Sequence, residues 1–203
     1  MIIIPKRFKH CTLDTYQINK SNRDAFEALK DYIANAGENY ENGKCFVLCG
    51  DVGVGKTHLA WGLARHIDEH WKVRASDLEK ALLNKEFSTY RIKREKVVFT
   101  DLNAILDSIK STFNRNKDYH QITHDEARKA DWLIVDEIGV QFDTDKERTM
   151  LYDIFNYRYN EMRPTILLSN LDRAGIYSKL GKRICDRIFG GAEYFYIKEG
   201  SHR

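Results

Sequence analysis

The stretch GDVGVGKT, residues 50–57, has the residue types and the spacing that bind the phosphates of a nucleotide. It matches G-x-x-x-x-G-K-[ST], in which glycines let backbone N–H groups approach phosphate oxygens. We expect Lys56 to reach the terminal phosphates and the Thr57 hydroxyl to ligate Mg²⁺. The other expected phosphate-loop residues are Gly50, Asp51, Val52, Gly53, Val54, Gly55 and His58. The competing interpretation is a glycine-rich turn that precedes Lys-Thr by chance.

A pair of carboxylates closes the aliphatic run WLIVDEIG, residues 132–139. Asp136 would lie at the carboxyl end of a strand, where open α/β sheets bind ligands, and could hold Mg²⁺ through water. Glu137 could orient and polarise the water that attacks a γ-phosphate. Asn170, at the end of PTILLSN, could sense or position that phosphate. The alternative is a pair of exposed acids that ends a strand.

Two histidine patterns have spacings known from metal sites. HIDEH, residues 66–70, satisfies H-x-x-E-H, and HQITH, residues 120–124, repeats the i, i+4 pair. His66 and His70 would end the helix that begins at the phosphate loop, a helix length away from the loop's chemistry. We therefore do not expect a zinc site there.

Five apolar runs with strand character must position these side chains, and helix-like spacing separates them. The runs are residues 44–49, 96–100, 131–136, 164–169 and 193–198. This alternation predicts an α/β domain with a five-stranded, mainly parallel sheet flanked by helices. The absence of a repeat or a clear linker predicts a single domain over residues 1–203.

Two segments lie outside this alternation. Residues 1–43 form an amino-terminal flank, in which SNRDAFEALKDYIANAG predicts a helix with Ser21 as its cap and Gly37 as its end. Residues 72–96 contain eight Lys or Arg against four Asp or Glu, and the Ser76 to Glu79 spacing is that of a capping box. We interpret this segment as an inserted basic helical excursion.

The overall composition is that of a globular protein. Hydrophobic residues make up 42% of the 203 and charged residues 31%, and a formal charge of +3 is too small for general attraction to nucleic acid. The four cysteines show no C-x-x-C spacing, and Cys45 and Cys49 would lie about 13 Å apart on an extended strand. Without a signal peptide or an apolar run of membrane-spanning length, we expect a reduced, cytoplasmic protein that does not enter membranes.

Taken together, these motifs resemble the DnaC/IstB branch of the AAA+ ATPases, and within it the DnaC-type replicative helicase loaders. The resemblance runs over nearly the whole chain. The segments that carry it are RFKHCTLDTY (7–16), GDVGVGKTHLA (50–60), VVFTDLNAILDSIKSTF (97–113), DWLIVDEIGVQ (131–141), RPTILLSN (163–170), LGKRICDRI (180–188) and EGSHR (199–203).

The resemblance implies a P-loop ATPase that uses ATP and Mg²⁺ and associates with itself when ATP is bound. Lys56 and Thr57 would be its Walker A pair, Asp136 and Glu137 its Walker B pair, and Asn170 its sensor 1 residue. Arg187 corresponds to the arginine finger that acts on ATP held by a neighbouring subunit, with Arg183 as the alternative. The same resemblance makes Arg203 the sensor 2 arginine.

The resemblance also implies a hexameric DnaB-type replicative helicase and single-stranded DNA as partners. In DSIKSTF, Lys110 could bind a DNA phosphate and Phe113 could stack on a base, and Lys146 is a further candidate. The alternative for Phe113 is a place in the core, on the helical face of Leu102 and Ile105. The chain begins almost at the ATPase domain, whereas loaders of this family usually carry an amino-terminal region that grips the helicase.

Three other functions remain possible from the sequence. The first is an IstB-like ATPase that binds duplex DNA and assists a transposase. The second is a small P-loop kinase that phosphorylates a nucleoside or nucleotide. The third is an adaptor that binds ATP and hardly hydrolyses it.

Overall fold

Five parallel strands form the sheet at the centre of the molecule. The computed structural model describes residues 2–70, 97–111, 122–138 and 145–198, with the side chains of 108–111 left out, so the basic segment 72–96 lies outside it. The strands are β1 (Phe46–Gly50), β2 (Val97–Asp101), β3 (Trp132–Asp136), β4 (Thr165–Ser169) and β5 (Glu193–Ile197). Their spatial order is β2-β3-β4-β1-β5, and all four pairings are parallel. The predicted α/β class and the five strands are confirmed.

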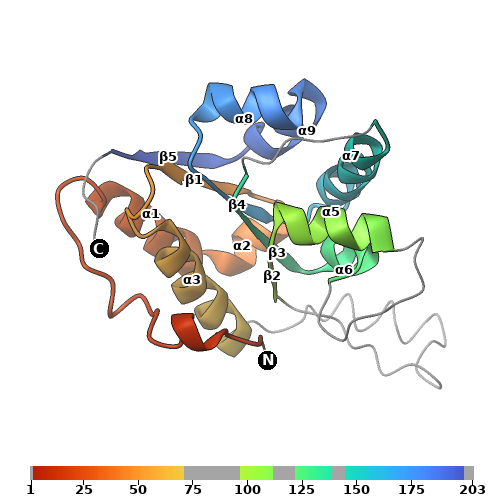
Figure 1. Ribbon diagram of the computed structural model, residues 1–203. Helices are drawn as coiled ribbons and strands as arrows, with labels where there is room; N and C mark the ends of the chain where they lie inside the picture. Colours follow the sequence, from red (N-terminus) through yellow and green to blue (C-terminus); the bar gives the residue numbers. More distant parts are fainter. Residues whose placement is uncertain (1, 71–96, 112–121, 139–144, 199–203) are drawn as a thin grey trace, which may run out of the picture.

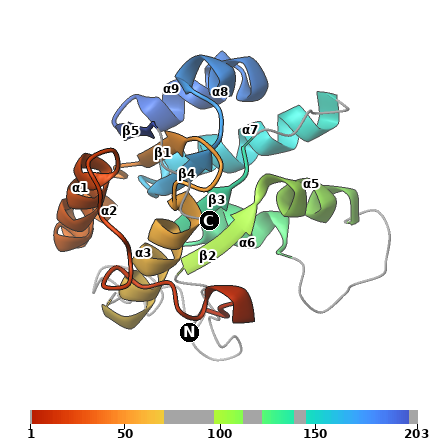
Figure 2. The same cartoon turned by 60° about the vertical axis from the view of Figure 1, so that its left-hand side comes forward.

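Helices cover both faces of the sheet (Figure 1). One face carries α1 (Arg23–Ala34), α2 (Ala36–Glu41) and α3 (Lys56–His70). The other carries α5 (Leu102–Ser111), α6 (His124–Lys129), α7 (Asp145–Asn160), α8 (Arg173–Leu180) and α9 (Lys182–Phe189). A short 3-10 helix, η1 (Lys6–Phe8), lies on the amino-terminal segment, which runs past α3 (Figure 2). None of the helices in the described ranges has the length and apolarity that crossing a bilayer requires.

Alternate residues of each strand fill the two cores. Phe46 and Leu48 pack toward α1, α2 and α3, whereas Val47 and Cys49 pack toward the helices of the opposite face. Because both faces are covered, the central strands β1, β3 and β4 are apolar along most of their length and show no polar alternation. This burial explains why the strands were visible in the sequence as continuous apolar runs.

The first long helix begins and ends differently from the prediction. The residue at its N-cap position is Asn22, whose side chain makes no capping hydrogen bond, and the Ser21 hydroxyl donates to Asn19 Oδ1 (2.7 Å). Gly37 does not end it either, since α1 stops at Ala34 and Gly37 lies inside α2. Gly37 also has no positive φ, so the left-handed turn expected of a terminating glycine is absent at this position.

A buried arginine joins the amino ends of β3 and β4, at the edge of the sheet opposite the phosphate loop. Arg158 of α7 is 1% exposed. Its guanidinium donates to the carbonyl oxygens of Ala127 (3.0 Å), Ala130 (2.8 Å) and Pro164 (2.6 Å) and to Thr165 Oγ1 (3.0 Å). Burial lowers the pKa of Arg158 to about 9, which still leaves the group charged at neutral pH.

We expect Arg158→Ala to lower the free energy of unfolding by about 3–5 kcal/mol, because it leaves several buried carbonyl oxygens without a donor. Urea denaturation measures this change, with Arg148→Ala, an exposed position on the same helix, as the matched control. Nucleotide affinity of the folded variant should be unchanged, since the substitution lies far from the phosphate loop. Equal denaturation midpoints for the two variants would contradict this role of Arg158.

Candidate nucleotide site

The phosphate loop links the end of β1 to the start of α3. Gly50 ends the strand, Lys56 begins the helix, and Gly50, Gly53 and Gly55 have φ angles of 146°, 89° and 92°. A Cβ at Gly55 would lie 2.7 Å from Cε2 of Tyr16. The backbone conformation and the close packing at position 55 therefore both require glycine.

The Lys56 ammonium lies inside the loop. Its Nζ donates to the carbonyl oxygens of Gly50 (2.8 Å) and Asp51 (2.7 Å), and the side chain is 7% exposed. Burial lowers the pKa of Lys56, and the nearby carboxylate of Asp136 opposes that effect. A buried cation whose only hydrogen-bond acceptors in the described structure are neutral carbonyl oxygens is suited to an anionic phosphate ligand.

Thr57 and Asp136 meet although 79 positions separate them in the chain. The Thr57 hydroxyl donates to Asp136 Oδ2 at 2.8 Å. Asp136 is the last residue of β3, and Thr57 is the second residue of α3. An adjacent hydroxyl and carboxylate at the helix amino end form the oxygen ligand set that Mg²⁺ prefers, so these residues fit the predicted metal.

Glu137 is exposed beside this pair because the backbone turns sharply at its position. Its φ is 56°, an unusual value for a residue other than glycine, and its N–H donates to Asp136 Oδ1 (2.8 Å). The next residue returns to the sheet: the Ile138 N–H donates to Leu168 O (3.3 Å), and its carbonyl accepts from Ser169 Oγ (2.8 Å). Ile138 is buried, which directs the neighbouring Glu137 side chain outward.

One cavity of about 670 Å³ joins these groups at the carboxyl edge of the sheet. The predicted site residues that line it are Val52, Gly53, Gly55, Lys56, Thr57, His58, Asp136, Glu137 and Asn170. Gly50 and Asp51 act through the carbonyl oxygens that hold Lys56, and Val54 is buried. Arg203 lies outside the described residues.

Sequence reasoning missed other residues that line the same cavity. Asp101 ends β2 beside Asp136, and its Oδ1 accepts from the Ala104 N–H (2.8 Å) at the start of α5. An aspartate directly after an apolar run was the available signal. Arg7 and Phe8 also line the cavity, from an amino-terminal stretch for which the sequence predicted no catalytic or binding residue.

Several hydrogen bonds fasten the amino-terminal segment to the phosphate loop and its helix. The Tyr16 hydroxyl donates to Val54 O (3.1 Å), and His58 Nε2 lies 2.9 Å from Thr12 O. The Tyr16 ring also packs edge-on against the His58 ring, with the centroids 5.4 Å apart. His58 therefore connects the amino-terminal segment to the loop as well as lining the cavity.

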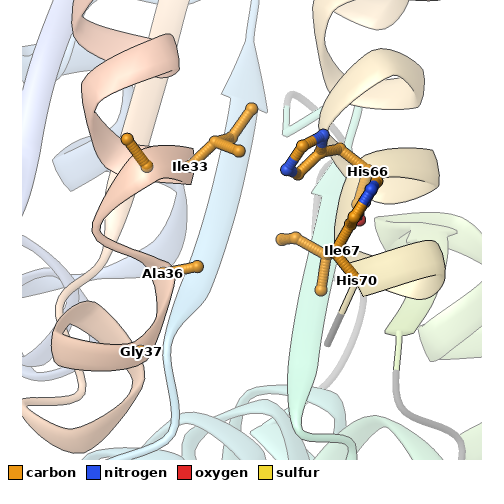
Figure 3. A pocket seen from close by; sticks show the side chains of 7 residues that line it. Ile33, Ala36, Gly37, His66, Ile67 and His70 are labelled. Carbon is orange, nitrogen blue, oxygen red and sulfur yellow. The ribbon is translucent and has the colours of Figure 1, made fainter. Parts of the chain in front are cut away.

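The HIDEH histidines lie at the far end of α3. Their rings stack with centroids 4.3 Å apart beside a separate cavity of about 350 Å³, lined also by Ile33, Ala36 and Ile67 (Figure 3). Among the described residues, the one group of three potential metal-ligating side chains is His10, Cys11 and His58, with ligand atoms within 4.8 Å of one another. Neither HIDEH histidine belongs to that group. All four cysteines are buried and free.

The two candidate arginine fingers, Arg183 and Arg187, lie on α9, away from this cavity. Arg183 is exposed, and Arg187 is partly buried against α7. Neither lines the cavity described above. Within one chain, the structure therefore does not bring Arg187 to the cavity that holds Lys56 and Asp136.

The proposed DNA residues are only partly described. Lys110 lies on α5 without a described side chain, Phe113 lies outside the described residues, and Lys146 is exposed in the first turn of α7. Leu102 and Ile105 of α5 are buried, as the amphipathic pattern predicted. The choice between DNA contact and core packing for Phe113 stays a prediction.

Comparison with known proteins agrees with this geometry. The family model described as the bacterial DnaA ATPase domain matches residues 8–193. The replicative helicase loader DnaC of Buchnera aphidicola subsp. Acyrthosiphon pisum is 28% identical over 204 residues, which cover 98% of this chain and 72% of that protein. The replicative helicase loader DnaC of Escherichia coli K12 is 22% identical over 190 residues, 93% of this chain and 67% of that protein.

Solved structures show the same architecture. The crystal structure of the DnaC helicase loader superposes with a TM-score of 0.72 and 26% identity, covering 96% of this chain and 100% of that one. AMPPCP-bound DnaA from Aquifex aeolicus superposes with a TM-score of 0.67 at 17% identity, covering 93% of this chain and 50% of that one, and supports the fold alone.

Proposed function

The chain belongs to the bacterial DnaA ATPase domain family and is a DnaC-like AAA+ protein, and on this basis we propose that it is an ATP-dependent loader of a replicative helicase. In this proposal it binds single-stranded DNA and loads or remodels a hexameric DnaB-type helicase. The observation that carries the proposal is the meeting of Lys56, Thr57, Asp136 and Glu137 in one cavity of a chain similar over nearly its full length to DnaC loaders.

In this proposal five residues of the cavity have tasks in ATP hydrolysis. Lys56 neutralises the terminal phosphates from inside the loop, which preorganises the site for negative charge. Thr57 and Asp136 would hold Mg²⁺, the ion that offsets charge on the β- and γ-phosphates when bound. Glu137, exposed at the cavity, orients water, and Asn170 contacts the γ-phosphate from the end of β4.

The rest of the site comes from outside this cavity. Arg187 contacts the ATP bound to a neighbouring subunit, and its planar guanidinium can donate two hydrogen bonds to one phosphate of that ATP. Arg203 acts as the sensor 2 arginine within the same assembly. ATP bound between subunits would favour self-association, and hydrolysis would release it. Lys110, Phe113 and Lys146 would contact the DNA strand.

Loading of the purified cognate hexameric helicase onto circular single-stranded DNA tests this function. We expect helicase bound to DNA to increase when the full chain and ATP are both present, and to stay at background with ADP, because closed DNA requires the ring to be opened. Isolation of the DNA by gel filtration followed by quantification of bound helicase gives the measurement.

Two controls separate the rival functions. In the first control, the chain is tested in parallel with a transposase on duplex DNA. Higher transposase activity, with no effect on helicase loading, would indicate the IstB-like role. ATP consumption that produces a phosphorylated small molecule and no free phosphate would indicate a kinase. Either result would overturn the loader proposal.

A further inference from the structure

Helix α9 presents one side to the core and another to α7. Ile184, Cys185 and Ile188 are buried, which docks the helix on the domain. Arg187 lies on a different side, where α9 packs against α7. The position of its guanidinium is therefore decided by residues of α7 more than 25 positions earlier in the chain.

Three hydrogen bonds and two aromatic contacts hold that guanidinium. Arg187 Nε donates to Asn156 Oδ1 (2.8 Å), one terminal nitrogen donates to the Tyr152 hydroxyl (2.7 Å), and the other donates to Arg183 O (2.7 Å). The cation also lies 4.8 Å from the Tyr152 ring centroid and 5.8 Å from that of Tyr159. A long side chain that would otherwise sample many rotamers is thus confined to one orientation.

The contacts leave the charge of Arg187 available. Its partners are an amide oxygen, a phenol oxygen and a backbone carbonyl, all neutral, and no salt bridge with Arg187 is present among the described residues. The neighbouring carboxylate of Asp186 accepts instead from Tyr177 (3.3 Å). Neutral partners leave the positive charge of Arg187 available to an anionic ligand such as a phosphate, which a guanidinium binds through charge-assisted hydrogen bonds.

A count of donors leads to the same conclusion. A guanidinium has five N–H donors, and the described contacts use three, one on each nitrogen. Each of the two terminal nitrogens therefore keeps one N–H. Two donors on the two terminal nitrogens are what bidentate contact with a phosphate requires.

We propose that Asn156 and Tyr152 are positioning residues for Arg187. They hold its guanidinium in the orientation that contacts the γ-phosphate of ATP bound to a neighbouring subunit. This inference rests on the shared-site part of the proposed function. Without the two anchors, the arginine would have to be ordered during each catalytic cycle, and misplacement of a catalytic group by about 1 Å can lower the rate by about 100-fold.

Substitutions at the two anchors test the inference through ATP turnover in the presence of single-stranded DNA. We expect Asn156→Ala to lower kcat by about 10- to 100-fold with KM for ATP unchanged, and Tyr152→Phe, which keeps the ring, to lower it less. Asn156→Gln keeps a neutral amide acceptor and should retain more activity than Asn156→Ala. Asn160→Ala, the same change at an exposed position of α7, should have no effect.

Mixing experiments separate this inference from the proposed function. Lys56→Ala protein has an intact arginine and its anchors, so it should restore turnover to Arg187→Ala and to Asn156→Ala protein alike. No restoration of Arg187→Ala would overturn the shared site itself. If Arg187→Ala is restored, full turnover by both Asn156→Ala and Tyr152→Phe would overturn only the positioning role. An Asn156→Ala defect that mixing does not relieve, or that Asn156→Gln shares equally, would overturn it too.

Discussion

Lys56→Ala will weaken ATP binding by about 100-fold or more, because it removes the one cation that lies inside the phosphate loop in the described structure. Lys56 is 7% exposed, so its charge is poorly screened by water and acts strongly on a phosphate. Alanine supplies neither the charge nor the hydrogen bonds. Isothermal titration with ATP and with ADP measures the loss.

The substitution also removes the donor for the carbonyl oxygens of Gly50 and Asp51, so loop stability needs a control. Thermal unfolding of Lys56→Ala without nucleotide shows whether the domain is intact. Lys20→Ala, at an exposed position, is the matched substitution and should bind ATP normally. If a folded Lys56→Ala protein binds ATP as tightly as the unsubstituted chain, the loop is not the phosphate site.

Glu137→Gln should leave ATP binding intact and lower turnover by about 100- to 10,000-fold, the range over which a positioned general base contributes. The carboxylate lies at the cavity, outside the Lys56 contacts, so binding does not depend on it. Glutamine has nearly the same shape and leaves the backbone at φ 56° unaltered. Phosphate release under saturating ATP, together with a binding titration, measures the two effects separately.

Two comparisons complete this experiment. Glu161→Gln, an exposed position after α7, should turn over ATP at the normal rate. Asp136→Asn should behave differently from Glu137→Gln, since it weakens the Mg²⁺ ligand set and so lowers nucleotide affinity as well. Normal turnover by Glu137→Gln would remove Glu137 from the chemical step.

The features that the sequence predicted correctly are those with local causes. The phosphate loop was visible because its glycines, Lys56 and Thr57 are adjacent in the chain and the backbone itself forms the cradle. The strands were visible because burial on both faces requires continuous apolar runs. From these two features the class of fold and the edge of the sheet that carries the site both followed.

Predictions at helix ends were less successful, because several nearby residues compete there for the same backbone groups. Ser21 was a reasonable cap by residue type, but Asn19 and Asn22 form the turn that starts α1. Gly37 was expected to end that helix, yet a second short helix continues through it. The Asn22 side chain makes no capping hydrogen bond either, so residue type alone did not predict how α1 begins.

The sequence by itself predicted a phosphate loop and an acidic pair from adjacent residues, and the resemblance to the DnaC/IstB branch added a late arginine. Only the tertiary structure decided which distant residues meet. The packing of strands and helices decides three such contacts. They are the 2.8 Å hydrogen bond from Thr57 to Asp136, the position of Asp101 in the cavity and the hydrogen bond from Arg187 to Asn156. Such contacts join positions tens of residues apart, and no local pattern in the chain records them, since the packing of the whole domain sets their distances.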